Sequence, residues 1–312
     1  MLDMHPKKAS PAKVLLSPFG RFIDGMAVRA MFPPGSRAID FSQPPGEAAL
    51  LSSDSLSWRI FKNPVSVLIG GITAVILELA EPAVRTGVWE HSSFRKDPLR
   101  RLQRTGLAAM MTVYGPRRTA ESMIAGVVRR HERIAGTTPD GVAYHASDPE
   151  LLDWVQATAT FGFVTAYSRY ASPLSEQEIS QAFAEGAQTS RLYGAVNAPA
   201  SADQWELLLE RMLDRLEPSP IILEFLDIMR SRALLPRPLR SLQGLFVRGA
   251  VELVPPQIRE HIGLKEKYVL RLGDVSLLRL LCAAADNTVL PSSPPAQACR
   301  RMGLPEDHLY GR

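Results

Sequence analysis

The spacing of apolar residues constrains this chain more than any other feature, because between about residues 51 and 290 it is almost everywhere helical. In few segments do apolar and polar residues alternate, and few segments contain clusters of β-branched residues, so strands are not expected. Helices are predicted over 64–80, 98–114, 117–134, 148–170, 175–192, 202–216, 219–232, 239–253 and 273–285. The predicted fold class is therefore all-α, with one large multi-helix domain.

The two ends of the chain differ from this central region. Residues 1–50 are rich in proline, glycine and serine, and residues 291–312 open on several prolines. Such breakers are spaced too closely for regular structure. We expect an irregular N-terminal arm over 1–50, a helical domain over 51–290 and a proline-rich C-terminal tail over 291–312.

Several functional classes lose their support because their motifs are absent. The sequence contains no HExxH, no GxxxxGK[ST], no GxSxG and no GxGxxG after a predicted strand. Its two cysteines form no CxxC pair and no signal peptide is recognisable, which predicts a cytoplasmic protein. The most apolar run, residues 65–77, is shorter than the roughly 20 residues needed to span a bilayer. We interpret it as a buried core helix.

Positive charge is concentrated in one region. Between Arg95 and Arg133 lie ten basic residues and three acidic ones. Such an excess suits nucleic acid, anionic lipid or a carboxylate-bearing cofactor, or is simply a solvated helix face. No aromatic interleaving or nucleic-acid motif accompanies it, so a nucleic-acid partner is not expected, whereas peripheral membrane association stays open.

One histidine shares a helix face with aliphatic residues. The predicted helix 117–134 places Ile124, Val127, Val128 and His131 at positions i, i+3, i+4 and i+7. A lone histidine on such a face is usually a core residue whose ring nitrogens are hydrogen-bonded. A neutral imidazole in an apolar slot is also what a haem iron needs as its proximal ligand, so both interpretations stand.

A polar column runs along the preceding helix, where Arg101, Thr105 and Thr112 line up with small residues. In the structural interpretation, Arg101 pairs with a carboxylate such as Glu90 and Thr105 bonds back to its own helix. In the functional one, the guanidinium and the hydroxyl point into a cavity, where they polarise bound oxygen or hold a propionate.

An ordered series of residues over about 58–180 resembles the family of MpaB-type and rubber oxygenases (latex clearing proteins). The matching residues are Trp58, Gly70-Gly71, Leu77-Glu78-Leu79-Ala80-Glu81-Pro82-Ala83-Val84, Gly87-Val88, Glu90-His91-Ser92, Phe94, Asp97-Pro98, Arg101-Leu102, Thr105, His131, Gly136, Asp140-Gly141, Tyr144, Ala146, Asp148-Pro149, Trp154-Val155, Ala157, Tyr170 and Pro173-Leu174-Ser175. Each match is weak alone, but their order is specific.

The resemblance implies a function. Characterised members are nearly all α-helical, bind haem b through one histidine and cleave isoprenoid carbon–carbon double bonds with dioxygen. By position, His131 corresponds to the iron ligand, while Arg101 and Thr105 correspond to the distal arginine and threonine. A glutamate is the general base in the rubber-cleaving branch, and Glu81 and Glu90 are the candidates here. The implied partners are haem b, dioxygen and a small apolar, isoprenoid-like substrate.

The chain departs from the family pattern at three positions. Many members have histidine where this chain has Glu81 and Gln156. Arg104 stands in the cofactor region where the rubber-cleaving branch can have a lysine that caps the iron. An arginine stays charged and has no lone pair to donate, so this capping is expected to be lost. The departures keep a second hypothesis open, namely a non-catalytic helical protein that binds a lipid or another apolar ligand.

The possible substrate channel is also predicted from helical spacing. Phe161, Phe163 and Tyr167 recur along the predicted helix 148–170 and are candidates to line it. Aromatic residues at this spacing more often form plain core. The oligomeric state stays open.

Overall fold

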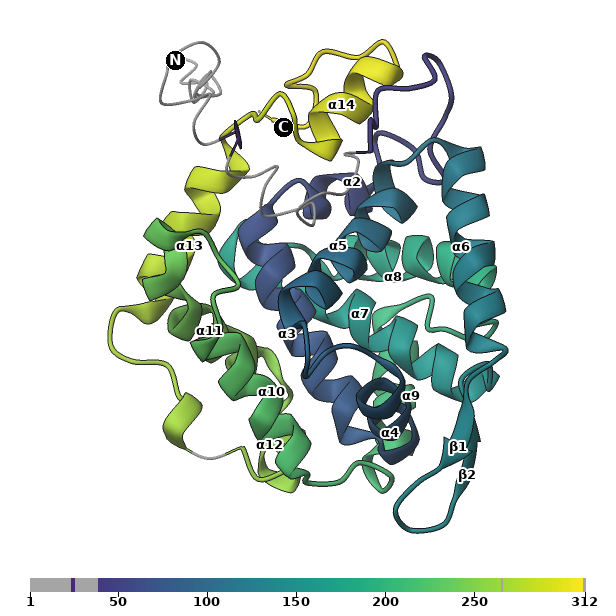
Figure 1. The fold of residues 1–312 in the computed structure, drawn as a ribbon. Helices are drawn as coiled ribbons and strands as arrows, with labels where there is room; N and C mark the ends of the chain where they lie inside the picture. The colour runs from purple at the N-terminus through teal and green to yellow at the C-terminus, as the bar shows by residue number, and fades with distance from the viewer. Residues whose placement is uncertain (1–23, 26–38, 265, 311–312) are drawn as a thin grey trace.

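The computed structural model describes residues 24–25, 39–264 and 266–310 and confirms the all-α prediction (Figure 1). Most of the predicted arm therefore lies outside the described residues. The helices are α2 (Leu56–Phe61), α3 (Pro64–Ala80), α4 (Pro82–His91), α5 (Pro98–Tyr114), α6 (Arg117–His131), α7 (Pro149–Tyr170), α8 (Glu176–Ser190), α9 (Ala202–Leu213), α10 (Pro220–Ser231), α11 (Gln243–Leu253), α12 (Pro256–His261), α13 (Asp274–Asp286) and α14 (Pro294–Arg301).

Short elements complete the fold. Three 3₁₀ turns, η1 (Arg191–Tyr193), η2 (Arg237–Leu242) and η3 (Glu266–Tyr268), connect helices. The strands β1 (Ala135–Thr137) and β2 (Ala143–His145) form an antiparallel hairpin after α6, in which Gly136 pairs with Tyr144. The predicted helix 117–134 therefore ends three residues early, at His131, and the expectation of no strands was wrong for this hairpin.

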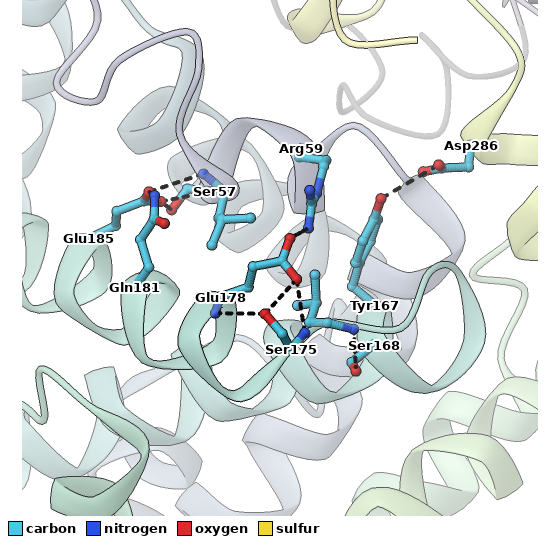
Figure 2. Close-up of polar contacts among 11 residues, drawn as sticks. Ser57, Arg59, Tyr167, Ser168, Ser175, Glu178, Gln181, Glu185 and Asp286 are labelled. Atoms are coloured by element: carbon cyan, nitrogen blue, oxygen red, sulfur yellow. Dashed lines mark hydrogen bonds and ion pairs between the residues drawn. The ribbon is translucent and has the colours of Figure 1, made fainter. Parts of the chain in front are cut away.

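Local capping explains where the helices begin. Asp97 accepts a hydrogen bond from the backbone N–H of Arg100, and Pro98 follows at the first helical position. At the start of α8, the predicted capping box between Ser175 and Glu178 is present (Figure 2). Glu178 also pairs with Arg59 of α2 at 2.6 Å. The glutamate of this capping box therefore also joins α8 to α2.

Helix α3 lies at the centre of the fold, and α7 packs along it (Figure 1). The two backbones meet at Gly70 and Gly162, where a Cβ on Gly70 would lie 2.5 Å from the Gly162 carbonyl oxygen. Only glycine permits this approach.

Among the described residues no single helix is long and apolar enough to cross a membrane. The helices α3 and α4, bent by 110° relative to each other, are together long and apolar enough to span a bilayer, by length and composition alone. Most residues of α3 are buried inside the protein.

Gly70→Ala is expected to destabilise the protein by about 2–3 kcal/mol, because α3 and α7 must separate to admit the methyl group. The adjacent Gly71→Ala is the matched control. A Cβ there meets only the Phe163 ring, at 3.8 Å, so the helix propensity of alanine is expected to leave stability unchanged or slightly raised. Urea denaturation followed by circular dichroism measures both. Equal effects would contradict the close approach of the helices.

A second core lies at the other end of the molecule and joins segments far apart in sequence. Phe41 and Leu50 from the N-terminal side pack with Met111 of α5, Ile124 of α6 and Cys299 of α14. Helix α14 lies within residues 291–312, which were predicted to be an irregular, proline-rich tail. The segments before α2 and after α13 therefore pack against α5 and α6 near the turn that connects these two helices.

Candidate functional site

Helices α5 and α6 form a hairpin that carries most of the predicted site residues. They pack on each other, α5 also packs on α2 and α14, and α6 packs on η1. Figure 1 shows the pair beside the central α3–α7 layer. The Thr112 hydroxyl lies 2.7 Å from that of Tyr193 in η1, which ties α5 to the body.

His131 is the last residue of α6, and its ring is half-buried. Its Nδ1 atom is enclosed and has no hydrogen-bond partner among the described residues. Burial, together with the charges of Arg101 and Arg130, lowers the pKa of His131. A neutral ring with an enclosed, unpartnered nitrogen is unusual for a core histidine.

Arg101 and Thr105 contact each other one turn apart on α5. The Arg101 guanidinium donates to the Thr105 hydroxyl, which donates to the Arg101 carbonyl oxygen at 3.0 Å. The expected bond of the threonine to its own helix is therefore confirmed. The expected pairing of Arg101 with Glu90 was wrong, because the carboxylate that acts on Arg101 is Glu78, and Glu90 is exposed at the end of α4.

Glu78 is the site residue that sequence reasoning missed. It lies in the last turns of α3, between the buried Leu77 and Leu79, and faces the positive charge of Arg101. Burial raises the pKa of Glu78 to about 7, and Arg101 opposes part of this shift. A carboxylate inside the most apolar helix of the chain was the signal that could have identified it.

Glu81 has different surroundings, although it follows Glu78 by only three residues. It is buried, caps α4 by accepting from the Val84 N–H at 2.7 Å, and pairs with Arg215 at 3.2 Å. Both carboxylate oxygens are thus engaged in holding α4 in place. The structure brings Glu78, Arg101 and His131 together and leaves Glu81 and Glu90 apart from them.

Positive charge dominates around His131. Burial lowers the pKa of Arg101, and the positive charges of Arg104 and Arg130 lower it further. The charges of Arg101 and Arg130 therefore act on the imidazole of His131, Arg104 acts on Arg101, and Glu78 supplies the negative charge that opposes the loss of the Arg101 proton. Such an excess of cations in a partly buried site favours an anionic ligand with more than one negative charge.

The aromatic residues proposed for a channel are part of the core packing. Phe161 stacks on Trp205 at 4.6 Å, and Phe163 packs against Phe61 at 4.6 Å. Tyr167 is fully buried and its hydroxyl reaches Asp286 (Figure 2). The core interpretation therefore holds for all three. Gln156, where many relatives have histidine, accepts from the Ser190 hydroxyl at 3.4 Å.

Comparison with known proteins identifies the family. Residues 58–287 match the family described as the ER-bound oxygenase mpaB/B′/rubber oxygenase catalytic domain. The chain belongs to this family. The mpaB/rubber-oxygenase match covers most of the chain, and it includes every site residue named above. It makes residues 58–287 an oxygenase-type catalytic domain.

Two curated relatives are similar over part of this chain. They are the uncharacterized proteins Mb2261 of Mycobacterium bovis and Rv2237 of Mycobacterium tuberculosis, each 27% identical over 179 residues. The alignments cover 55% of this chain and 70% of each relative. No solved structure matches this chain.

Proposed function

We propose that the protein is a haem b-dependent oxygenase that cleaves or oxygenates an isoprenoid-like alkene with dioxygen. The observation that carries this proposal is the unpartnered, enclosed Nδ1 of His131, whose ring is acted on by the charges of Arg101 and Arg130. Membership of the mpaB/rubber-oxygenase family supports it.

The residues present fit this cofactor. Haem b needs a neutral imidazole for its iron, cations for its two propionates and apolar walls for its ring. His131 would bind the iron, Arg101, Arg104 and Arg130 would hold the propionates, and aliphatic residues of α6 such as Val127 would contact the ring. When bound, the haem supplies the chemistry that activates dioxygen.

The remaining chemistry falls to three side chains. Glu78, with a pKa of about 7, is the general base that removes an allylic proton from the substrate. Arg101 stabilises the ionised form of Glu78 and the negative charge that develops on oxygen. Thr105, already bonded to Arg101, orients the oxygen atoms. The apolar surroundings of Glu78 suit an apolar alkene.

The test is spectroscopic. Protein expressed with a haem precursor is expected to show a Soret band and a pyridine haemochrome spectrum of haem b. His131→Ala is expected to lose the band, whereas the matched control His145→Ala, on the exposed strand β2, keeps it. No band in the wild type, or a band unaffected by His131→Ala, would contradict the proposal.

A second candidate function follows from the same cations. Arg101, Arg104 and Arg130 beside aliphatic helix faces also suit the carboxylate of a fatty acid, which makes a non-catalytic lipid-binding protein the alternative. Native mass spectrometry separates the two. A retained lipid in protein that contains no iron, even after expression with the haem precursor, would favour the alternative.

A further inference from the structure

One face of α13 is apolar and uncovered. Leu277, Leu280 and Ala284 lie at positions i, i+3 and i+7, so they share one side of the helix, and all three are exposed. Leu278 and Cys282 on the opposite side are buried, against the core formed with α11, α3 and α7. Helix α13 therefore has one apolar face packed on the core and a second apolar face exposed on the surface.

The turn before α13 extends this face. Gly273, with φ of +89°, ends a tight turn that leaves Leu272 fully exposed, and Val269 is exposed just before it. Four of the large apolar side chains that the described residues expose thus lie between 269 and 280. Exposed apolar groups concentrated in this way mark an interaction surface.

The charges around this face are basic. Arg271 and Arg279 are exposed beside it, and Arg169 of α7 is adjacent to Arg279, since its carbonyl oxygen accepts from the Arg279 side chain. Arg271 lies near the carboxylate of Asp274, to which its backbone N–H donates, whereas no carboxylate of the described residues pairs with Arg169 or Arg279. The acidic residue within 267–284 is Asp274, which is buried and bound to Arg248 at 2.7 Å. The face therefore combines leucines with exposed arginines, of which Arg169 and Arg279 have no carboxylate partner among the described residues.

We propose that this docking face, comprising Val269, Arg271, Leu272, Leu277, Arg279 and Leu280, binds the surface of an anionic lipid membrane. Leucines at such a face enter the acyl boundary while arginines remain at the headgroups, where anionic lipids attract them. A second copy of the chain fits less well, because symmetric pairing would bring like-charged arginines together. Helix α13 lies across α3 from α5 and α6 (Figure 1), so docking leaves the candidate site uncovered. The inference rests on this surface alone and not on the proposed oxygenase function.

Vesicle flotation of the full chain tests the docking face. The wild type is expected to float at low salt with vesicles of phosphatidylcholine containing about one third phosphatidylserine, and to be released at about 0.5 M NaCl. Leu272→Ser combined with Leu280→Ser is expected to weaken binding about tenfold or more. The matched control is Leu207→Ser combined with Val196→Ser. These side chains are 59% and 58% exposed, against 66% for Leu280, and lie outside the docking face.

Three results would overturn the inference. They are a wild type that stays with the unbound fraction at low salt, equal losses in the two double variants, and a concentration-dependent dimer that the Leu272 and Leu280 changes dissociate without any flotation. Because all the changed residues are exposed, circular dichroism is expected to show the wild-type fold in both variants. Flotation needs neither haem nor turnover, so its failure is distinct from a failure of the proposed reaction.

Discussion

Replacing Glu78 with glutamine is expected to lower oxygenase turnover by about 10²–10⁴-fold while leaving haem binding intact. Glutamine keeps the size and polarity of the side chain but cannot accept the allylic proton. Measuring oxygen uptake with a prenyl compound, alongside the Soret band, separates loss of the base from loss of the cofactor. This prediction rests on the proposed function.

The same residue gives opposite pH trends for activity and stability. Turnover is expected to rise as the pH increases through about 7, because the base must be ionised. Stability is expected to fall over the same range. The folded pKa is raised from 4.5, so the folded protein binds more protons than the unfolded chain between pH 4.5 and 7. The stability contribution of Glu78 is thus full below pH 4.5 and lost as the pH rises to 7.

The loss amounts to about 3 kcal/mol, so Glu78→Gln is expected to be more stable than the wild type at pH 8 by up to this amount. Urea denaturation at pH 5 and pH 8 measures the difference. Glu81→Gln is the comparison, and it is expected to cost about 1 kcal/mol, because the ion pair with Arg215 is lost while the amide oxygen can still accept from the Val84 N–H. Turnover that survives Glu78→Gln but not Glu81→Gln would assign the base to Glu81 instead.

Arg301→Ala is expected to destabilise the protein by about 3–5 kcal/mol. The side chain is 2% exposed and donates to the carbonyl oxygens of Phe41 at 2.5 Å, Glu47 at 2.8 Å and Tyr114 at 2.7 Å. Tyr114 ends α5, so the guanidinium also lies at the negative end of that helix. Removing it leaves two buried carbonyl groups and one partly buried one without this donor.

The adjacent Arg300 is the matched control for this prediction. It is partly exposed and pairs with Glu306 at 2.7 Å on the surface, so Arg300→Ala is expected to change stability by less than about 1 kcal/mol. Urea denaturation curves of both variants provide the measurement. Similar midpoints for Arg301→Ala and the wild type would show that α14 does not hold the end of α5.

The long helices were predictable because their signals are local. The predicted ranges 64–80 and 98–114 coincide with α3 and α5. Each begins with a polar cap followed by proline, and each carries a strong apolar pattern. The short elements α2, α4, α12, α14 and the β-hairpin were missed. Such short segments are held by contacts with distant parts of the chain, as α14 is held by Phe41 and Tyr114.

The sequence by itself determined the helical class and the residues that match the oxygenase family, and it singled out the histidine that we propose as the iron ligand. Only the tertiary structure decided which carboxylate joins them. Glu78 and Glu81 would share one face of a continuous helix, but α3 ends at Ala80 and the chain bends by 110° at Glu81. The bend makes Glu81 a cap for α4 and leaves Glu78 facing Arg101. A side chain's partner depends on how helices cross in space, and the spacing of residues along one helix does not contain that information.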